Sequence, residues 1–413
     1  MTNQTKHKCL FCKAPLKHIF ADLGTCPPSN AFLDEEQLYE PEQFYPLHAY
    51  VCEKCLLVQG PHYKRPQDIF THDYAYHSSY STSWVEHAKK YVESMKERFN
   101  LDTNSFILEI GSNDGYLLQH ALKLKIPCLG IDPSTGAASV AQAKGIPTIT
   151  TFFTKKLAKS LLKNGVQADL ICGINVFAHV PDINDLVAGM SMLIKPNGVM
   201  TMEFPHLLKL VEEVQFDTIY HEHYFYYTLF CVKQIVEAHN MRLFDVEQLP
   251  THGGSLRVYA CLQTSDHETT ENIEKVLREE KKAGMDKLAF YLNFQEKINK
   301  IQFSLMRFLM EAKGQGKKVA AYGAAAKGNT LFNYFGINKN LIPYVVDASP
   351  YKQGKYLPGS RIPVVSENML LQYKPDYILI LPWNLKEEIS AQLAYTRRWG
   401  AKFVIAIPKL EVM

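Results

Sequence analysis

Short apolar runs alternate with helical patterns between residues 105 and 262. Runs of this length, rich in Ile, Leu and Val, are typical of strands buried in a parallel sheet with helices on both faces. The alternation therefore predicts an α/β domain. The expected strands lie at residues 106–110, 128–131, 168–173, 198–204 and 256–262.

Helical patterns and a second set of apolar runs flank this domain. An amphipathic helix is expected at 83–99, and a long helical stretch at 265–313 opens on Ser265-Asp266 as a cap. The long stretch is predicted to be core and bridge, with no site. Beyond it a strand, a loop and a helix begin at residue 317. Further strands at 342–346, 376–381 and 403–407 predict a smaller parallel sheet.

The first expected strand leads into a loop that predicts a ligand site. The loop reads Glu109-Ile-Gly111-Ser-Asn-Asp114-Gly115, and its glycines allow a sharp turn into the next helix. The next strand ends at Asp132, followed by Pro133. Asp132 lies about 20 residues after Gly111, where a ribose-binding carboxylate is expected.

The carboxylates of this loop indicate which cofactor suits it. Glu109 and Asp114 would repel a pyrophosphate, whereas S-adenosylmethionine carries a sulfonium and an amino group and no phosphate. We therefore expect this loop and Asp132 to bind S-adenosylmethionine. The alternative is a strand, loop and helix without a ligand.

Length, composition and charge narrow the class of protein. A chain of 413 residues with 46% hydrophobic and 21% charged residues is typical of a globular protein of two or three domains. The net charge of +3 is spread without a basic tract, so no nucleic acid partner is expected. No apolar run has membrane-spanning length and the N-terminus lacks a signal-peptide pattern, which predicts a cytoplasmic protein without a membrane partner.

Four of the nine cysteines form two Cys-x-x-Cys pairs, Cys9 with Cys12 and Cys52 with Cys55. Each pair turns tightly enough to direct two sulfurs at one ion, which predicts a zinc site with four thiolate ligands. The segment between the pairs is longer than in usual zinc ribbons, so a looped-out insertion is expected. Four thiolates fill a tetrahedral ion, and the zinc is therefore expected to be structural.

Two segments carry groups suited to acid–base chemistry. Asn175 and His179 follow the strand at 168–173, which places them at the same sheet edge as Gly111. The segment Tyr220-His221-Glu222-His223 offers an imidazole to accept a proton and a carboxylate and a phenol to orient it. The alternatives are a structural His179 and a solvated loop at 220–227. A metal site is disfavoured at 220–223, because neighbouring side chains diverge.

Two other segments leave their roles open. Residues 72–84 are dense in hydroxyls and aromatic rings, and either line a sugar-binding cleft or pack between domains. Gly323-Ala-Ala-Ala-Lys327-Gly-Asn329 places small residues and one lysine at the start of a helix. That loop either cradles a nucleotide or phosphate or belongs to a packed structural domain.

Together these motifs resemble the nucleotide-sugar C-methyltransferases, over essentially the whole chain. The resemblance implies a class I S-adenosylmethionine methyltransferase core of the Rossmann-like α/β class. It also implies a zinc-binding domain at 1–72, the methyltransferase domain at 73–264, a helical bridge at 265–316 and a C-terminal Rossmann-like, sugar-nucleotide-binding domain at 317–413. The motifs occur in the family's order: the four cysteines, Glu109 to Gly115, Asn175 to Asp182, Tyr220 to Tyr226, His252-Gly-Gly-Ser-Leu-Arg257, and Gly323 to Asn329.

The resemblance further implies a reaction and roles for residues. Enzymes of this family methylate a ring carbon of a 4-keto-6-deoxy sugar linked to a nucleoside diphosphate, here dTDP or GDP, after removing the proton at C-3. By match, His223 is the base and Glu222 and Tyr220 support it, while His179 and Tyr76 match other active-site positions. The competing functions are methylation of a sugar oxygen or nitrogen, and a zinc-containing protein that binds S-adenosylmethionine without catalysis. Asn175 falls in a cofactor motif, and the substrate-binding matches are His252, Arg257, Gly323, Lys327 and Asn329.

Overall fold

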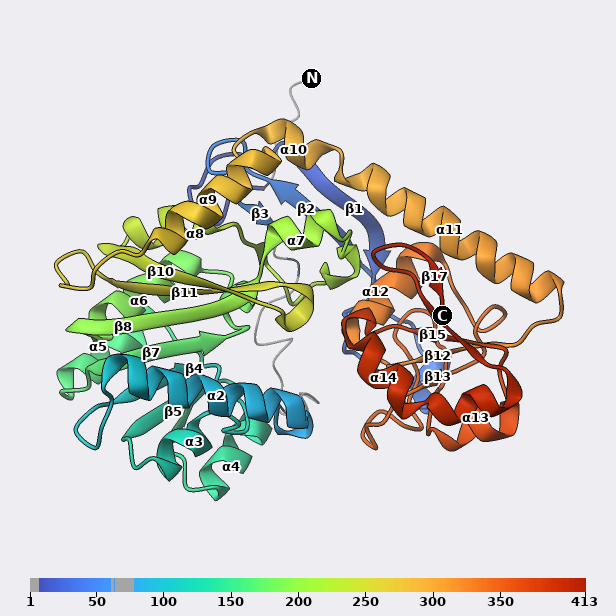
Figure 1. Ribbon diagram of the computed structural model, residues 1–413, viewed down its shortest axis with the longest axis horizontal. Helices are drawn as coiled ribbons and strands as arrows, with labels where there is room; N and C mark the ends of the chain where they lie inside the picture. Colours follow the sequence, from blue (N-terminus) through green and yellow to red (C-terminus); the bar gives the residue numbers. More distant parts are fainter. Residues whose placement is uncertain (1–6, 61–62, 64–77) are drawn as a thin grey trace.

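The computed structural model describes residues 7–60, 63 and 78–413, and the strands of these residues form three sheets. In Figure 1 the seven-stranded sheet lies on the left, the six-stranded sheet on the right, and a small N-terminal sheet above and between them. This arrangement confirms the expected Rossmann-like α/β architecture. Within the described residues, no helix combines the length and apolar character needed to cross a bilayer.

The seven-stranded sheet has the strand order β10-β11-β8-β7-β4-β5-β6. β4 pairs in parallel with both β5 and β7, so the strand order reverses at β4. Ligands of such sheets bind at the carboxyl ends of the strands beside this reversal, where the loop after β4 lies. The strands are β4 (Ile107–Ile110), β5 (Cys128–Asp132), β6 (Thr148–Thr150), β7 (Ala168–Ile174), β8 (Ile194–Pro205), β10 (Met241–Leu249) and β11 (Ser255–Leu262).

One edge of this sheet differs from the parallel arrangement expected from the sequence. β11 pairs antiparallel with β8 and β10, because the short connection at 250–254 leaves no room for a crossover. The pattern of apolar runs also misses β10 and β6. Charged residues such as Arg242 and Glu247 interrupt β10, and β6 has only three residues.

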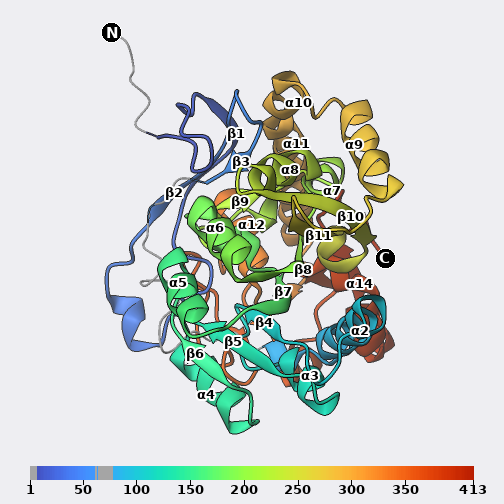
Figure 2. The same ribbon diagram turned by 90° about the vertical axis from the view of Figure 1, so that its left-hand side faces the viewer.

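Helices cover both faces of the sheet, with α5 and α6 on one side and α2 and α3 on the other (Figure 2). The helix expected at 83–99 is confirmed as α2 (Thr82–Phe99), whose first turn is capped by the Ser81 side chain. Its buried face repeats at helical spacing, through Ala88, Val92 and Met95. The other helices of this region are α3 (Leu118–Lys123), α4 (Thr135–Ala143), α5 (Lys155–Lys163), α6 (Ile183–Leu193), α7 (Leu207–Glu212) and α8 (Leu229–Glu237).

The small N-terminal sheet takes one strand from the middle of the chain. Its order is β1 (His18–Cys26), β2 (Tyr45–Val51), β3 (Val58–Gln59) and β9 (Phe225–Tyr226). β9 begins two positions after His223 and pairs antiparallel with β3. This pairing joins the Tyr-His-Glu-His segment to the cysteine-bearing part of the chain.

The six-stranded sheet is parallel except at one edge, where β17 pairs antiparallel with β16. The prediction of a fully parallel sheet is therefore wrong at one short terminal strand. Its strands are β12 (Val319–Tyr322), β13 (Val345–Val346), β14 (Val364–Val365), β15 (Tyr377–Ile380), β16 (Lys402–Ile405) and β17 (Glu411–Val412). The helices are α12 (Ala326–Phe335), α13 (Asn368–Tyr373) and α14 (Lys386–Gln392).

The helical bridge is divided into α9 (Glu271–Ala283), α10 (Leu288–Leu292) and α11 (Phe294–Gly314), which run over the top of the molecule (Figure 1). The cap expected at Ser265 is wrong, because α9 begins only after Thr270. In the irregular stretch before it, the Arg242 guanidinium binds the carbonyl groups of Ser265 and His267. Gly284, with φ +92°, ends α9.

Glu280 of α9 joins the bridge to the seven-stranded sheet. Its carboxylate is buried, lies 2.7 Å from His206 Nε2, and accepts hydrogen bonds from the backbone N–H groups of Leu229 and Phe230 at the start of α8. One carboxylate thus satisfies an imidazole and two amides that α8 leaves without helical partners.

Replacing Glu280 with alanine should lower the free energy of unfolding by about 3–5 kcal/mol, because the buried His206 imidazole and two backbone amides lose their acceptor. The urea-unfolding midpoint measures the effect. Glu274→Ala, at an exposed position of the same helix, is the matched control and should change the midpoint little. Equal midpoints for the two variants would contradict the role given to Glu280.

Candidate active site

The loop after β4 packs closely against the residues that follow the neighbouring strand β7. Gly111 has φ +69°, and a Cβ there would lie 2.3 Å from Val176 Cγ2, so a side chain is excluded. The Asp132 carboxylate accepts hydrogen bonds from the backbone N–H groups of Asn113 (2.9 Å) and Ser134 (2.8 Å). Asp132 thereby fixes both the loop and the residue that follows Pro133.

Three buried carboxylates gather at this loop: Glu109, Asp114 and Asp132. Burial, followed by the charges of Asp132 and Asp114, raises the pKa of Glu109 well above its usual value. Burial also raises the pKa of Asp132, although its two backbone hydrogen bonds oppose the shift. Negative charge concentrated in a buried loop favours a cationic ligand and disfavours an anionic one.

Asn175 lies at the end of β7, beside the same loop. Its backbone adopts φ +56°, its N–H donates to the Glu203 carbonyl (2.9 Å), and its Nδ2 donates to His252 Nε2 (2.8 Å). The Asn175 Oδ1 atom is buried and has no hydrogen-bond partner among the described residues. An unsatisfied buried acceptor beside acidic groups is suited to a ligand that carries an N–H or O–H donor.

His223 lies in a cluster of three rings from two segments of the chain. Its ring centroid is 4.7 Å from that of His179, which belongs to the 3-10 helix η3 (Phe177–His179), and 4.0 Å from that of Tyr220. His223 Nδ1 donates to the Thr218 carbonyl at 2.9 Å, because a carbonyl oxygen can only accept. In the neutral ring the proton therefore sits on Nδ1, and Nε2 carries the lone pair.

Burial keeps both histidines of this cluster neutral. It lowers the pKa of His179 to about 4, a shift opposed by a hydrogen bond to the Glu222 backbone. Burial and the neighbouring His179 place the pKa of His223 well below its usual value. His223 is therefore an unprotonated imidazole at neutral pH, as a proton acceptor must be.

The other members of the Tyr-His-Glu-His segment point to the N-terminal part of the chain. Glu222 Oε1 accepts a hydrogen bond from Asn30 Nδ2 at 2.7 Å, and His221 Nε2 donates to the Pro46 carbonyl at 3.1 Å. His221 and His223 thus bind different backbone carbonyls, as the predicted divergence of neighbouring side chains requires.

Two loops of the C-terminal part, at 323–329 and 382–384, lie close to the same region, and Trp383 makes the contact. Gly323 has φ +92°, and a Cβ there would lie 2.4 Å from Pro382. Lys327 Nζ donates to Asn384 Oδ1 at 2.7 Å and lies 4.4 Å from the centroid of the Trp383 ring. A Cβ on Gly253 would lie 2.6 Å from Trp383, so this ring packs directly against the loop that carries His252.

Electrostatic effects connect these side chains. Burial lowers the pKa of Lys327, and the charge of Asp217 opposes this shift. Burial raises the pKa of Asp217 to about 6, although Lys327 and the Trp383 N–H, which donates to Asp217 at 2.8 Å, lower it. Burial, followed by the charge of Lys327, lowers the pKa of His252 to about 4. Lys327 is therefore a half-buried lysine close to both histidine-bearing loops.

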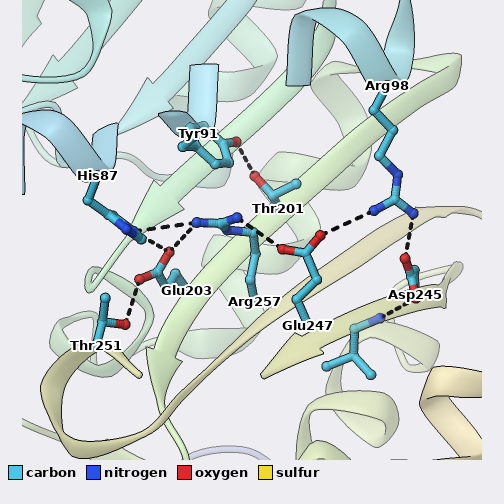
Figure 3. A network of polar contacts seen from close by, with 10 residues as sticks. His87, Tyr91, Arg98, Thr201, Glu203, Asp245, Glu247, Thr251 and Arg257 are labelled. Carbon is cyan, nitrogen blue, oxygen red and sulfur yellow. Dashed lines mark hydrogen bonds and ion pairs between the residues drawn. The ribbon is translucent and has the colours of Figure 1, made fainter. Parts of the chain in front are cut away.

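The remaining predicted residues lie in different surroundings. Asn329 Nδ2 donates to the Ser29 carbonyl at 2.6 Å, and Tyr76 lies outside the described residues. Arg257 occupies a polar network between α2 and the sheet (Figure 3), where its guanidinium binds Glu203 (2.9 Å) and Glu247 (3.0 Å). The structure thus places Arg257 between two carboxylates, and no described contact joins it to His223.

The four expected metal ligands come together in the N-terminal sheet region. Their sulfurs all lie within 4.8 Å of one another, with Cys9 3.6 Å from Cys55 and Cys12 3.5 Å from Cys52. Zinc–sulfur bonds of about 2.3 Å in a tetrahedron require sulfurs under about 4 Å apart, so the donor set fits a zinc ion. With four thiolates bound, zinc would cross-link the β1 and β2 ends and leave no position for a substrate.

Comparisons with known proteins identify the family. Residues 250–408 match the C-methyltransferase C-terminal domain, residues 84–246 a methyltransferase domain, and residues 9–70 a zinc binding domain. The chain is 33% identical to the C-methyltransferase NovU of Streptomyces niveus over 390 residues, which span 94% of this chain and 93% of that protein. The chain belongs to the C-methyltransferase family.

Two more distant similarities each cover less than half of the chain. The ubiquinone biosynthesis O-methyltransferase of Bartonella quintana (strain Toulouse) is 28% identical over 98 residues, which span 24% of this chain and 40% of that protein. The crystal structure of a S-adenosylmethionine-dependent methyltransferase from Clostridium acetobutylicum ATCC 824 aligns with 43% of this chain and 92% of that chain. This alignment has 12% identity and a TM-score of 0.35.

The C-methyltransferase uses S-adenosylmethionine, as predicted from the sequence. The cofactor supplies an electrophilic methyl group on a sulfonium. The residues present fit it, since a buried acidic loop and the unsatisfied Asn175 Oδ1 suit a ligand with a positive charge and N–H and O–H donors. Glu109, Asp132 and Asn175 would hold it.

Sequence reasoning assigned no role to three side chains that contact the predicted site residues or lie near them: Asn30, Asp217 and Trp383. Asp217 lies three positions before Tyr220, so a search for buried carboxylates near that motif would have given it one. Asn30 and Trp383 have no such signal, because each reaches the site from a loop distant in sequence.

Replacing Cys12 with serine should release zinc and lower the thermal unfolding midpoint by about 5 °C or more, because a ligand of a structural metal site is lost. Metal analysis and thermal unfolding measure both effects. Cys128→Ser, a buried cysteine in β5, is the control and should keep its zinc. Full zinc content in Cys12→Ser would contradict the assignment.

Replacing Glu109 with glutamine should weaken S-adenosylmethionine binding about 10-fold or more at pH 8, because a charged partner of the cation is lost. A cationic ligand favours the ionised carboxylate, and the pKa of Glu109 is raised. Wild-type affinity should therefore increase as the pH rises through that pKa, and the variant should show a smaller increase.

Calorimetric titration between pH 6 and pH 9 measures this dependence. Glu93→Gln, at an exposed position of α2, is the control and should bind like the wild type. If Glu109→Gln matched wild-type affinity at every pH, Glu109 would not face the cofactor.

Proposed function

We propose that this C-methyltransferase methylates C-3 of a 4-keto-6-deoxy sugar linked to a nucleoside diphosphate, dTDP or GDP. The observation that supports this most directly is the hydrogen bond from His223 Nδ1 to the Thr218 carbonyl. It fixes the tautomer in which Nε2 can accept a proton, in a buried site beside Tyr220 and His179. A ring carbon becomes nucleophilic only after losing a proton next to a ketone, so such a base is the group the reaction needs.

In the proposed reaction His223 Nε2 takes the C-3 proton, and the resulting negative charge moves to the oxygen at C-4. Glu222 and Tyr220 are proposed to support the base, and His179 and Tyr76 to donate hydrogen bonds to this enolate oxygen. The C-3 carbon would then bond to the methyl group as the methyl–sulfur bond breaks, which leaves the electron pair on sulfur and releases S-adenosylhomocysteine. The imidazolium later returns its proton to solvent. Methyl transfer itself mainly needs alignment of the two reactants.

The nucleoside diphosphate is proposed to bind against the loop at 323–329 of the C-terminal part. Lys327 is a half-buried lysine whose charged form an anion would stabilise, and Gly323 brings the loop backbone close to Pro382. The loop that carries His252 lies on the same side of the site, because its residue Gly253 packs against Trp383. In this proposal the chain keeps the four-part division, and the sugar lies between the methyltransferase and C-terminal parts.

The proposal is tested by incubating the purified protein in D2O with dTDP- and GDP-linked 4-keto-6-deoxy sugars. Without S-adenosylmethionine, deuterium should enter C-3. With the cofactor, a new C-3 methyl group should appear by NMR. A methyl group on oxygen or nitrogen would instead support the competing methyltransferase functions, and cofactor binding without any transfer would support a binding protein.

Replacing His223 with glutamine should lower the C-3 exchange rate about 100-fold to 10,000-fold, because the proton acceptor is lost. His221→Gln is the matched control, since His221 binds the Pro46 carbonyl and lies in the same segment. The two exchange rates are compared by NMR at pH 8. Unchanged exchange in His223→Gln would remove His223 from the role of base.

A further inference from the structure

We propose that Asn30, in the segment between the two cysteine pairs, is a positioning residue for Glu222. The zinc-bearing part of the chain then forms one wall of the active site. The inference rests on the proposed function, in which Glu222 supports the base His223. It adds a residue that no motif of the sequence indicates.

The contact itself is short and partly buried. Asn30 Nδ2 donates to Glu222 Oε1 at 2.7 Å, and the Glu222 side chain is 3% exposed. The Glu222 backbone is hydrogen-bonded to His179, and the adjacent residue His223 contacts His179 through its ring. Asn30 therefore holds the residue that links both histidines of the cluster.

Asn30 is itself held in place from both sides. On one side the Ser29 carbonyl accepts the Asn329 amide at 2.6 Å, and Ser29 is buried. On the other side Leu33 and Tyr356 exchange two backbone hydrogen bonds, of 3.0 Å and 2.8 Å. Because the C-terminal part fixes the backbone around Asn30, the amide is preorganised for Glu222 and loses little entropy on making the bond.

An uncharged donor suits this position. An amide orients a carboxylate without cancelling its charge, whereas a lysine or arginine would neutralise it. When His223 accepts a proton, the negative charge of Glu222 is then available to stabilise the imidazolium. Among the described groups, the Glu222 charge acts on Tyr224, whose pKa is raised to about 12 by burial followed by that charge, and the Glu222 backbone is hydrogen-bonded to His179.

Asn30→Asp tests the inference with almost no change in volume. At pH 8 it places a second carboxylate against Glu222, and C-3 exchange should fall about 100-fold because the charge is displaced or protonated. Lowering the pH to 6 should recover part of the rate, since one of the two carboxylates then takes up a proton. Asn30→Ala removes the donor and should lower kcat about 10-fold with little change in KM.

Asp34→Asn is the matched control on the same segment. Asp34 forms an exposed ion pair with Lys355 at 3.4 Å, and its loss should leave exchange at the wild-type rate. All variants should keep zinc, a normal circular dichroism spectrum and wild-type affinity for S-adenosylmethionine. A loss of zinc or fold that accounted for the whole rate loss in both Asn30 variants would show a purely structural role and overturn the inference.

The remaining outcomes separate this inference from the function on which it rests. Wild-type protein that exchanges C-3, with Asn30→Asp and Asn30→Ala both matching Asp34→Asn, overturns the role of Asn30 alone. A pH profile of Asn30→Asp identical to that of the wild type would also overturn the role of Asn30 alone. Wild-type protein without exchange or transfer on either keto sugar overturns the proposed function and this inference together.

Discussion

The antiparallel pairing of β3 with β9 is the contact on which the active-site arrangement depends. It aligns Val58 with Tyr226 and Gln59 with Phe225, directly after the Tyr-His-Glu-His segment. At the following residue, Tyr227, the chain bridges to His206 at the end of β8. The segment is therefore held between the N-terminal sheet and the seven-stranded sheet. Because backbone hydrogen bonds fix both attachments, the His223 ring has a defined place relative to the loop after β4.

Charge of opposite sign collects on two sides of this arrangement. Glu109, Asp114 and Asp132 crowd the carboxyl ends of β4 and β5, while Lys327 lies beside the loop that carries His252. Removal from water destabilises the charged form of each group, and a ligand of opposite charge would offset this cost. A sulfonium cofactor suits the first side, and an anion such as the proposed sugar nucleotide suits the second.

Local patterns in the sequence were sufficient for much of the fold. The runs at 106–110 and 128–131 correspond to β4 and β5, and the spacing around Cys9 and Cys52 predicted a sulfur cluster that the structure contains. Predictions were wrong where distant groups determine the backbone. Ser265 does not cap a helix, since α9 begins only after Thr270, and Arg242 of strand β10 binds the Ser265 carbonyl. β10 was missed because its charged residues are satisfied by partners outside the strand, such as Arg98 for Asp245.

The sequence by itself determined which chemical groups the protein carries: an acidic glycine loop, a Tyr-His-Glu-His segment and four metal-binding thiols. Each is encoded within a few consecutive residues, so its local geometry follows from backbone preferences and side-chain type. Only the tertiary structure decided which groups meet. Asn30 and Glu222 are 192 positions apart, and Asp217 and Trp383 are 166 apart. Such contacts depend on how three sheets pack against one another, and this packing is set by the summed burial of many side chains and by no single motif.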